Sequence, residues 1–185
     1  MGVAMKVNTS RFGHLEVSDR DFISFPEGLL GFQNLKKFFI TDPADETFIL
    51  WLQSVEDPHI AFPILEPKIF RSDYAVRLSA NELRLLQLDS LSQKDILVFS
   101  VITIPADPKQ MTANLKAPIV INAEKQVGRQ VVLQENAYSI KCAMYKELMA
   151  AIMIASKAMA QEEKAPEAVA LSLVRASSNV EVSAL

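Results

Sequence analysis

Cysteine is almost absent from this chain of 185 residues, which contains only Cys142. A single cysteine excludes an intramolecular disulfide and is typical of proteins in reducing compartments. Residues 1–10 also lack a basic segment followed by an apolar one, so they do not resemble a signal peptide. We therefore expect a cytoplasmic protein.

Long apolar runs and excess positive charge are missing as well. The longest apolar run, 148–160, is interrupted by Lys157 and is shorter than the roughly 20 residues that cross a membrane. The formal net charge is −3 and the isoelectric point is about 5.5, whereas nucleic-acid-binding domains usually gather Lys and Arg on one face. We expect neither a membrane segment nor direct nucleic-acid binding. A mildly acidic surface would instead favour encounter with a basic partner.

The chain also lacks a recognisable catalytic or metal-binding motif. Cys142, which we expect at the start of a helix, would need His14 or His59 as a base to act as a nucleophile. No signature of a cysteine enzyme surrounds it, so an ordinary packed cysteine is the favoured interpretation. The acidic residues of 42–46 lack the further oxygen ligands of a calcium loop, which favours an exposed turn. We predict no catalytic residue, no cofactor and no metal site.

What the chain does contain is a succession of short β-prone runs. Between Lys6 and Lys141 these runs alternate with turn residues, which is typical of an antiparallel sandwich or barrel. Strands are expected at 22–25, 38–40, 47–53, 60–65, 96–104, 119–121 and 127–133. Pro63 should confine its strand to an edge or a bulge, and Gly128 suits a turn or a bulge. The run Ile119–Ile121 is apolar and β-branched, as in a strand buried on both faces.

A short helix interrupts the strands. Ser79 and Glu82 have the spacing of a capping box, in which each side chain bonds the other residue's backbone N–H, so a helix is expected over Ala80–Leu86. Four amide side chains also stand at or beside strand ends, namely Gln53, Asn114, Asn122 and Gln130. Amides in such places usually bond nearby backbone groups. Clustered at one end of a barrel, they would instead contribute to a recognition surface.

The composition changes near Cys142, where Ala, Met, Lys and Glu become frequent. Apolar residues at helical spacing over 144–159 predict a helix that extends to about Lys164. We favour packing of its apolar stripe on the barrel over a role in docking a partner. A weaker helix is expected over 167–175, and the last ten residues are expected to be frayed.

Together these patterns predict a mainly β fold. We expect a small antiparallel β-barrel-like domain over 1–146, with the short internal helix, and a partly flexible helical extension over 147–185. Because the strands are complete before the extension begins, removal of the residues after Lys146 should leave the barrel folded.

Several segments occur in an order that one protein family shares. They are Phe25–Phe32, Phe48–Ser54, Ala61–Pro63, Pro67, Tyr74, Thr112–Asn122, Gly128–Leu133 and Tyr138. On this ordered set the sequence resembles the FliW family of flagellar assembly factors, over roughly Met5 to Lys146. Leu30 stands where that family often has proline, and the tail from Glu147 onward is longer than the family leads us to expect.

The resemblance implies a small non-enzymatic β-barrel protein of the bacterial cytoplasm that binds unexported flagellin and the RNA-binding regulator CsrA. Binding CsrA away from its RNA-contacting surface would relieve its repression of flagellin synthesis allosterically. From their positions in loops and at strand ends, Gln53, Glu66 and Asp73 are the residues we expect to contact CsrA. Two alternatives are a general chaperone-like β module that holds clients by edge-strand addition and a hydrolase that uses Cys142.

Overall fold

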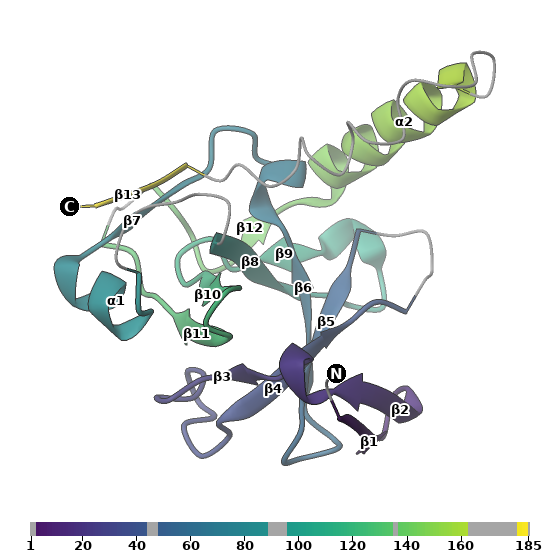
Figure 1. Cartoon of the computed structure of the whole chain (residues 1–185). Coiled ribbons are helices and arrows are strands. Elements are labelled where there is room, and N and C mark those ends of the chain that lie inside the picture. Colours follow the sequence, from purple (N-terminus) through teal and green to yellow (C-terminus); the bar gives the residue numbers. More distant parts are fainter. Residues whose placement is uncertain (1–2, 44–47, 89–95, 135–136, 163–180, 185) are drawn as a thin grey trace.

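The structure, a computed structural model, describes residues 3–43, 48–88, 96–134, 137–162 and 181–184. Seven strands form a closed barrel in the order β10-β11-β3-β4-β5-β6-β8, and β8 pairs with β10 to complete the ring. Their bounds are β3 Ile23–Ser24, β4 Lys37–Thr41, β5 Leu50–Ser54, β6 Ala61–Leu65, β8 Ile96–Thr103, β10 Ile119–Asn122 and β11 Val127–Gln130. Figure 1 shows how the remaining elements surround these strands.

Strand β8 joins the parts of the sheet. Its first half, Ile96–Phe99, pairs with β10, the next two residues pair with β6, and the last two pair with β9 (Thr112–Ala113). β9 in turn pairs with β12 (Cys142–Ala143). The described pairs of this sheet are antiparallel except β11 with β3, which meet in parallel at one residue pair. The predicted fold class, mainly β with an antiparallel barrel, is confirmed.

The barrel wall is buried on two faces by two separate hydrophobic clusters. The inner cluster gathers side chains from strands around the ring, including Phe38 of β4 and Ile119 and Ile121 of β10. Val120, between those two isoleucines, belongs to an outer cluster. Side chains alternate between the faces of a strand, so β10 is buried on both faces, as its apolar β-branched sequence predicts.

The outer cluster holds a second layer against the barrel. This layer contains β7 (Ala75–Leu78), α1 (Ala80–Leu85) and the start of α2 (Tyr145–Glu162). On the opposite side, β1 (Ala4–Thr9) and β2 (Gly13–Ser18) form a separate hairpin. The hairpin packs on Phe39 in a third small cluster.

The predicted internal helix is present as α1, and both arms of its capping box form. Ser79 Oγ accepts a hydrogen bond from Glu82 N at 3.3 Å, and Glu82 Oε2 accepts one from Ser79 N at 2.7 Å. These two bonds satisfy backbone donors that the first turn of a helix would otherwise leave unpaired, which confirms the capping box.

Two predictions about proline and glycine are wrong. β6 contains Pro63 yet lies between β5 and β8 rather than at an edge. Only Ile64 and Leu65 pair with β8, so Pro63 lies before the stretch where that neighbour needs a backbone donor. Gly128 lies within β11 rather than in a turn, and a Cβ there would be 2.6 Å from Phe25 Cε1. The ring of Phe25 occupies the space that the missing side chain leaves.

The region that follows the barrel begins differently from what the sequence predicts. Cys142 lies in the short strand β12 rather than at the start of a helix. Met144 and Leu148 are buried in the outer cluster and Ile152 packs against it, which confirms that the apolar stripe packs on the barrel at this end. Farther along, α2 extends away from the body of the molecule (Figure 1).

The last described residues form a strand. β13 (Glu181–Ala184) pairs in parallel with β7, so the expectation of a frayed terminus is wrong for these residues. The weaker helix expected over 167–175 lies outside the described residues. The division of the chain at residue 146 into a barrel and an extension stays a prediction.

Truncation after Lys146 should leave a folded but less stable barrel. The truncated chain loses Leu148, which is 4% exposed, and truncating a buried leucine typically costs about 2–5 kcal/mol. Urea unfolding followed by circular dichroism would measure this loss.

Leu148→Ala in the full chain should show a similar loss. Met153→Ala, on the same helix but at a position 57% exposed, should change the free energy of unfolding by less than about 0.5 kcal/mol. Equal effects of the two substitutions would contradict the packing described.

Candidate partner-binding surface

Gln53, one of the three residues expected to contact CsrA, is completely buried. Its Nε2 donates toward the carbonyl oxygens of Ser54 and Ile60, each at 3.0 Å, and lies 3.4 Å from that of Asp57. Ser54 ends β5, whereas Asp57 and Ile60 lie in the loop between β5 and β6. Within this loop Ile60 O also accepts from Ser54 N at 2.9 Å, and Asp57 O accepts from Ile60 N at 3.2 Å. Gln53 therefore holds this loop, and in this conformation its side chain cannot touch a partner. The prediction of a direct contact is corrected for this residue.

The other three amides also serve the fold. Asn122 donates to two carbonyl oxygens at the end of α1, and its Oδ1 accepts from two backbone N–H groups of the turn that follows β10. Gln130 accepts from Leu30 N at 3.0 Å and donates to Ala117 O at 3.0 Å. Asn114 Oδ1 accepts from Ala117 N. These amides bond backbone groups, some of them distant in the sequence, such as those of Leu30 and Leu86, so the structure assigns them a role in holding the fold.

Cys142 and the histidines do not form a catalytic pair among the described hydrogen bonds. The Cys142 sulfur accepts a hydrogen bond from Arg71 Nη2 at 3.4 Å. His59 Nδ1 lies 2.8 Å from Ser10 Oγ. His14 lies on β2, which Figure 1 shows at the end of the molecule away from β12. Neither of these hydrogen bonds joins the thiol to an imidazole, as a cysteine nucleophile would need.

The acidic turn of 42–46 lies mostly outside the described residues, since 44–47 are not described. Over the described part of the chain, no three His, Cys, Asp or Glu side chains come together as a group that would hold a metal ion. Likewise, no described helix is long and apolar enough to cross a membrane.

Glu66 and Asp73 lie at the two ends of one short segment. This segment, Glu66–Asp73, contains the 3-10 helix η2 (Pro67–Ile69) and follows directly after β6; we call it the η2 segment. Asp73 is exposed, whereas Glu66 is half-buried and its side chain makes no capping hydrogen bond. Burial of the Glu66 carboxylate raises its pKa from 4.5 to about 7, although the positive charge of Lys68 partly opposes the shift.

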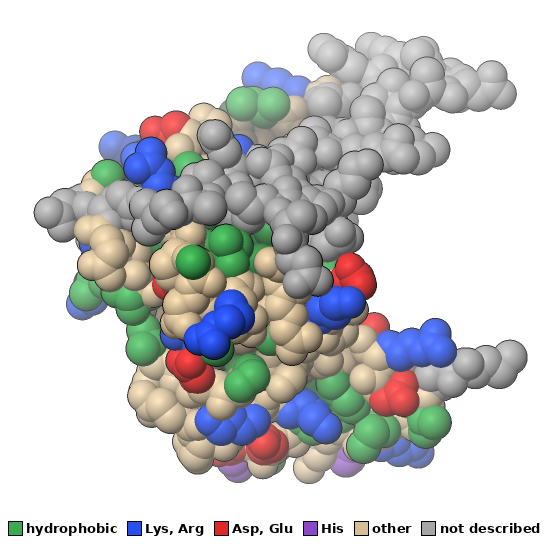
Figure 2. Space-filling model, turned by 60° about the vertical axis from the view of Figure 1, so that its left-hand side comes forward, with side chains coloured by type: hydrophobic (Ala, Val, Ile, Leu, Met, Phe, Trp, Pro, Cys, Tyr) green, Lys and Arg blue, Asp and Glu red, His purple; other side chains and the backbone are tan. Residues whose placement is uncertain are grey.

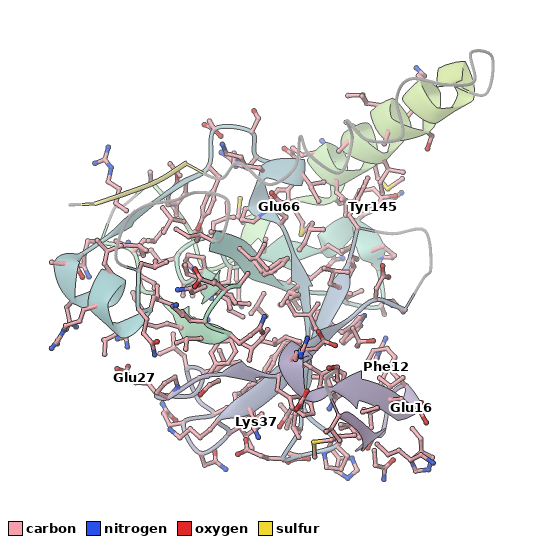
Figure 3. All side chains as sticks on the ribbon, in the orientation of Figure 1. Phe12, Glu16, Glu27, Lys37, Glu66 and Tyr145 are labelled. Atoms are coloured by element: carbon pink, nitrogen blue, oxygen red, sulfur yellow. The ribbon has the colours of Figure 1, made fainter. Side chains whose placement is uncertain are left out.

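The second half of the η2 segment is fastened to the body. Phe70 is buried in the outer cluster, and the next residue, Arg71, reaches β12 through its bond to Cys142. Directly after the segment, Tyr74 is fully buried and its hydroxyl donates to Leu115 O at 2.8 Å. Figure 3 shows Glu66 and Tyr145, the first residue of α2, at the same end of the molecule, far from Glu16 of the hairpin. Two carboxylates are therefore presented on a rigid segment beside the base of α2.

The face of the molecule that Figure 2 shows carries mixed charge. Figure 2 shows Lys and Arg side chains interspersed with Asp and Glu side chains, and with hydrophobic ones, over the face in view. No single-sign area stands out on that face, which agrees with the expectation from composition. A partner that binds this face would therefore be recognised by a local arrangement of groups rather than by a large uniform field.

The segment Phe25–Phe32 shapes one end of the barrel. Phe25 is fully buried in the inner cluster, and Gly28 has φ +70°. A Cβ at Gly28 would lie 2.6 Å from Phe32 O, so this turn has no room for a side chain. Beside it, Glu27 (Figure 3) forms an ion pair with Arg129 at 2.5 Å. The packing of Phe25 and the tight turn at Gly28 account for the conformation of this segment, so a ligand is not needed to explain it.

The fold and the site together define a small closed β-barrel protein with an appended helix, in which buried amides such as Gln53 and Asn122 bond backbone groups. The family description FliW protein matches residues 6–144, which include the whole barrel. The chain belongs to the FliW family.

Individual relatives agree with this assignment. A flagellar assembly factor FliW of Bdellovibrio bacteriovorus is 44% identical over 144 residues, covering 78% of this chain and 81% of the relative. One of Clostridium tetani is 36% identical over 143 residues, covering 77% of this chain and 97% of the relative. A crystal structure of the flagellar assembly factor FliW superposes with a TM-score of 0.70 at 33% identity, covering 75% of this chain and 96% of that one.

The raised pKa of Glu66 predicts that stability falls as pH rises. Between the ordinary value of 4.5 and the folded value of about 7, the folded protein binds more protons than the unfolded chain. The contribution of protonated Glu66 to the free energy of unfolding is therefore complete below pH 4.5 and is lost as pH rises through about 7. Because Glu66 is only half-buried, we expect a loss on the order of 1–2 kcal/mol.

Urea unfolding at pH values on either side of this window would test it. Glu66→Gln cannot ionise and should lose this part of the pH dependence, whereas Asp73→Asn, at the exposed end of the same segment, should retain it. Identical pH profiles for the wild-type protein and Glu66→Gln would show that the carboxylate is not desolvated.

Proposed function

We propose that this protein binds flagellin and CsrA in the bacterial cytoplasm, and that binding to CsrA relieves its repression of flagellin synthesis. The observation that carries the proposal is the family match over the whole barrel, 6–144, together with relatives named as flagellar assembly factors. The protein then acts by binding rather than by catalysis. The described hydrogen bonds, which pair Cys142 with Arg71 and His59 with Ser10, support this reading over that of a hydrolase.

The two partners exclude each other in this proposal. Flagellin that occupies the protein lowers its affinity for CsrA, and by thermodynamic linkage CsrA lowers its affinity for flagellin by the same factor. When flagellin leaves the cell, the freed protein antagonises CsrA. The antagonism is allosteric, because the protein binds CsrA away from the RNA-contacting surface.

We place the CsrA contact on the η2 segment. Asp73 is an exposed carboxylate next to the anchored Tyr74, so binding does not have to order a long loop around it. Glu66 changes its charge near pH 7, so its contribution to binding a basic partner should rise with pH. Gln53 supports the site only indirectly, through the loop that it holds.

Titration calorimetry against the same organism's CsrA, before and after saturation with its flagellin, would test the proposal. Tight CsrA binding that flagellin abolishes is the expected result. Asp73→Lys combined with Glu66→Lys should weaken CsrA binding by about tenfold or more, because opposite charges become like charges. Glu16→Lys makes one such charge reversal at an exposed position on the hairpin and should leave the affinity unchanged.

The outcomes separate the parts of the proposal. Unchanged CsrA affinity in the double variant would place the contact elsewhere on the protein. Binding to flagellin alone would contradict the CsrA antagonism and leave a dedicated flagellin chaperone. Binding to neither partner would overturn the proposal as a whole.

A further inference from the structure

Strand β7 pairs with the end of its own chain. β7 and β13 form a separate two-stranded sheet, parallel, with Glu181 opposite Ala75 and Ala184 opposite Leu78. Among the described strands, β13 is the one that pairs with β7. Without β13, that edge of β7 would present unpaired backbone N–H and C=O groups to solvent, which is the template for adding a strand from another segment.

The edge of β7 is held rigidly by the core. Val76 and Leu78 are both 0% exposed and belong to the outer cluster. Ala75 N donates to Tyr138 Oη at 3.1 Å, which fixes the start of the strand. A strand that adds to this edge therefore meets a preformed partner and does not have to order it, which lowers the cost of binding.

The two strands differ in how they relate to the family. β7 lies inside the residues that match the family, 6–144, whereas β13 lies outside them. The match to the Clostridium tetani relative covers 97% of that protein but only 77% of this chain. The edge is thus part of the shared barrel domain, and the strand that covers it here is an addition to that domain.

The chain is long enough for β13 to cover the edge of its own molecule. α2 contains 18 residues and is therefore about 27 Å long, and Figure 1 shows it pointing away from β7 and β13. Residues 163–180 link the end of α2 to β13. Their extended length would be about 60 Å, roughly twice that of the helix, so the return to β7 does not require a second copy of the chain.

We propose that the edge of β7 is a strand-addition site for an extended segment of a protein partner, and that β13 occupies it as an intramolecular competitor. The partner segment runs parallel to β7. It is acidic in character, because Arg77 is the exposed side chain of β7. The inference does not depend on the identity of the partners proposed above, since its test uses the chain's own segment as the probe.

A fluorescent peptide of residues 178–185 tests the proposal by anisotropy, with two full-length proteins. One is the wild-type chain and the other carries Val182→Pro and Ser183→Pro, which remove two consecutive backbone N–H groups of β13. Because successive residues of a strand direct their N–H groups to opposite edges, one of the two removed donors faced β7. The variant should bind the peptide at least about tenfold more tightly than the wild-type chain, because its own strand no longer competes.

Two controls identify the edge as the site of binding. The same peptide with both prolines should not bind the variant. Hydrogen exchange of those amides of Val76–Leu78 that face β13 should accelerate in the variant and slow again when the unmodified peptide is added, whereas the Ala75 amide, which bonds Tyr138 Oη, should change little. Circular dichroism should show the barrel intact, since the substitutions lie outside 6–144.

Three results would overturn the proposal. Equal binding of the peptide to both proteins would show that β13 does not compete for the edge. Binding to neither would show that the edge does not accept an added strand. Unchanged exchange in the variant at those amides of Val76–Leu78 that face β13 would show that β13 does not protect β7. Each of these would leave the calorimetry with CsrA and flagellin unaffected, so the two proposals fail independently.

Discussion

The structure depends most on strand β8. It pairs with β10 and β6 and so completes the ring, and it also carries β9, through which β12 and the base of α2 are attached. Phe99 of β8 belongs to the inner cluster, whereas Val98 and Ile102 belong to the outer one. Loss of this strand would therefore open the ring and expose both cores, which makes the barrel and its outer layer a single cooperative unit.

Closure of the ring also explains which groups the buried amide side chains bond. Short strands leave many loop carbonyls and amides without a ladder partner, and a buried unpaired group costs about 1–3 kcal/mol. Asn122 and Gln130 bond such groups at separate loops, and Gln53 adds a second hydrogen bond to Ile60 O, which also accepts from Ser54 N. Because these amides are engaged in intramolecular hydrogen bonds, we expect partners to contact other side chains, on exposed and anchored segments such as the η2 segment.

Local signals in the sequence predict local structure well here. The capping box of α1 and the two-sided burial of β10 follow from neighbouring residues alone. The failures depend on distant parts of the chain. Gly128 is needed because Phe25 packs over it, and Pro63 is tolerated because β8 begins to pair one residue later. In the same way, the direction of Gln53 is set by the loop that folds over it, which a sequence pattern does not specify.

The pairing of β13 with β7 is short, and this suits a competitor better than a structural element. A tethered strand has an effective concentration in the millimolar range. If the free segment bound the edge with a Kd of about 0.1 mM, the tethered strand would occupy it about 90% of the time and weaken a partner about tenfold, or 1.4 kcal/mol. A partner strand that makes a few more contacts would overcome this difference. A longer β13 would block the edge permanently, whereas a four-residue strand leaves it open to displacement.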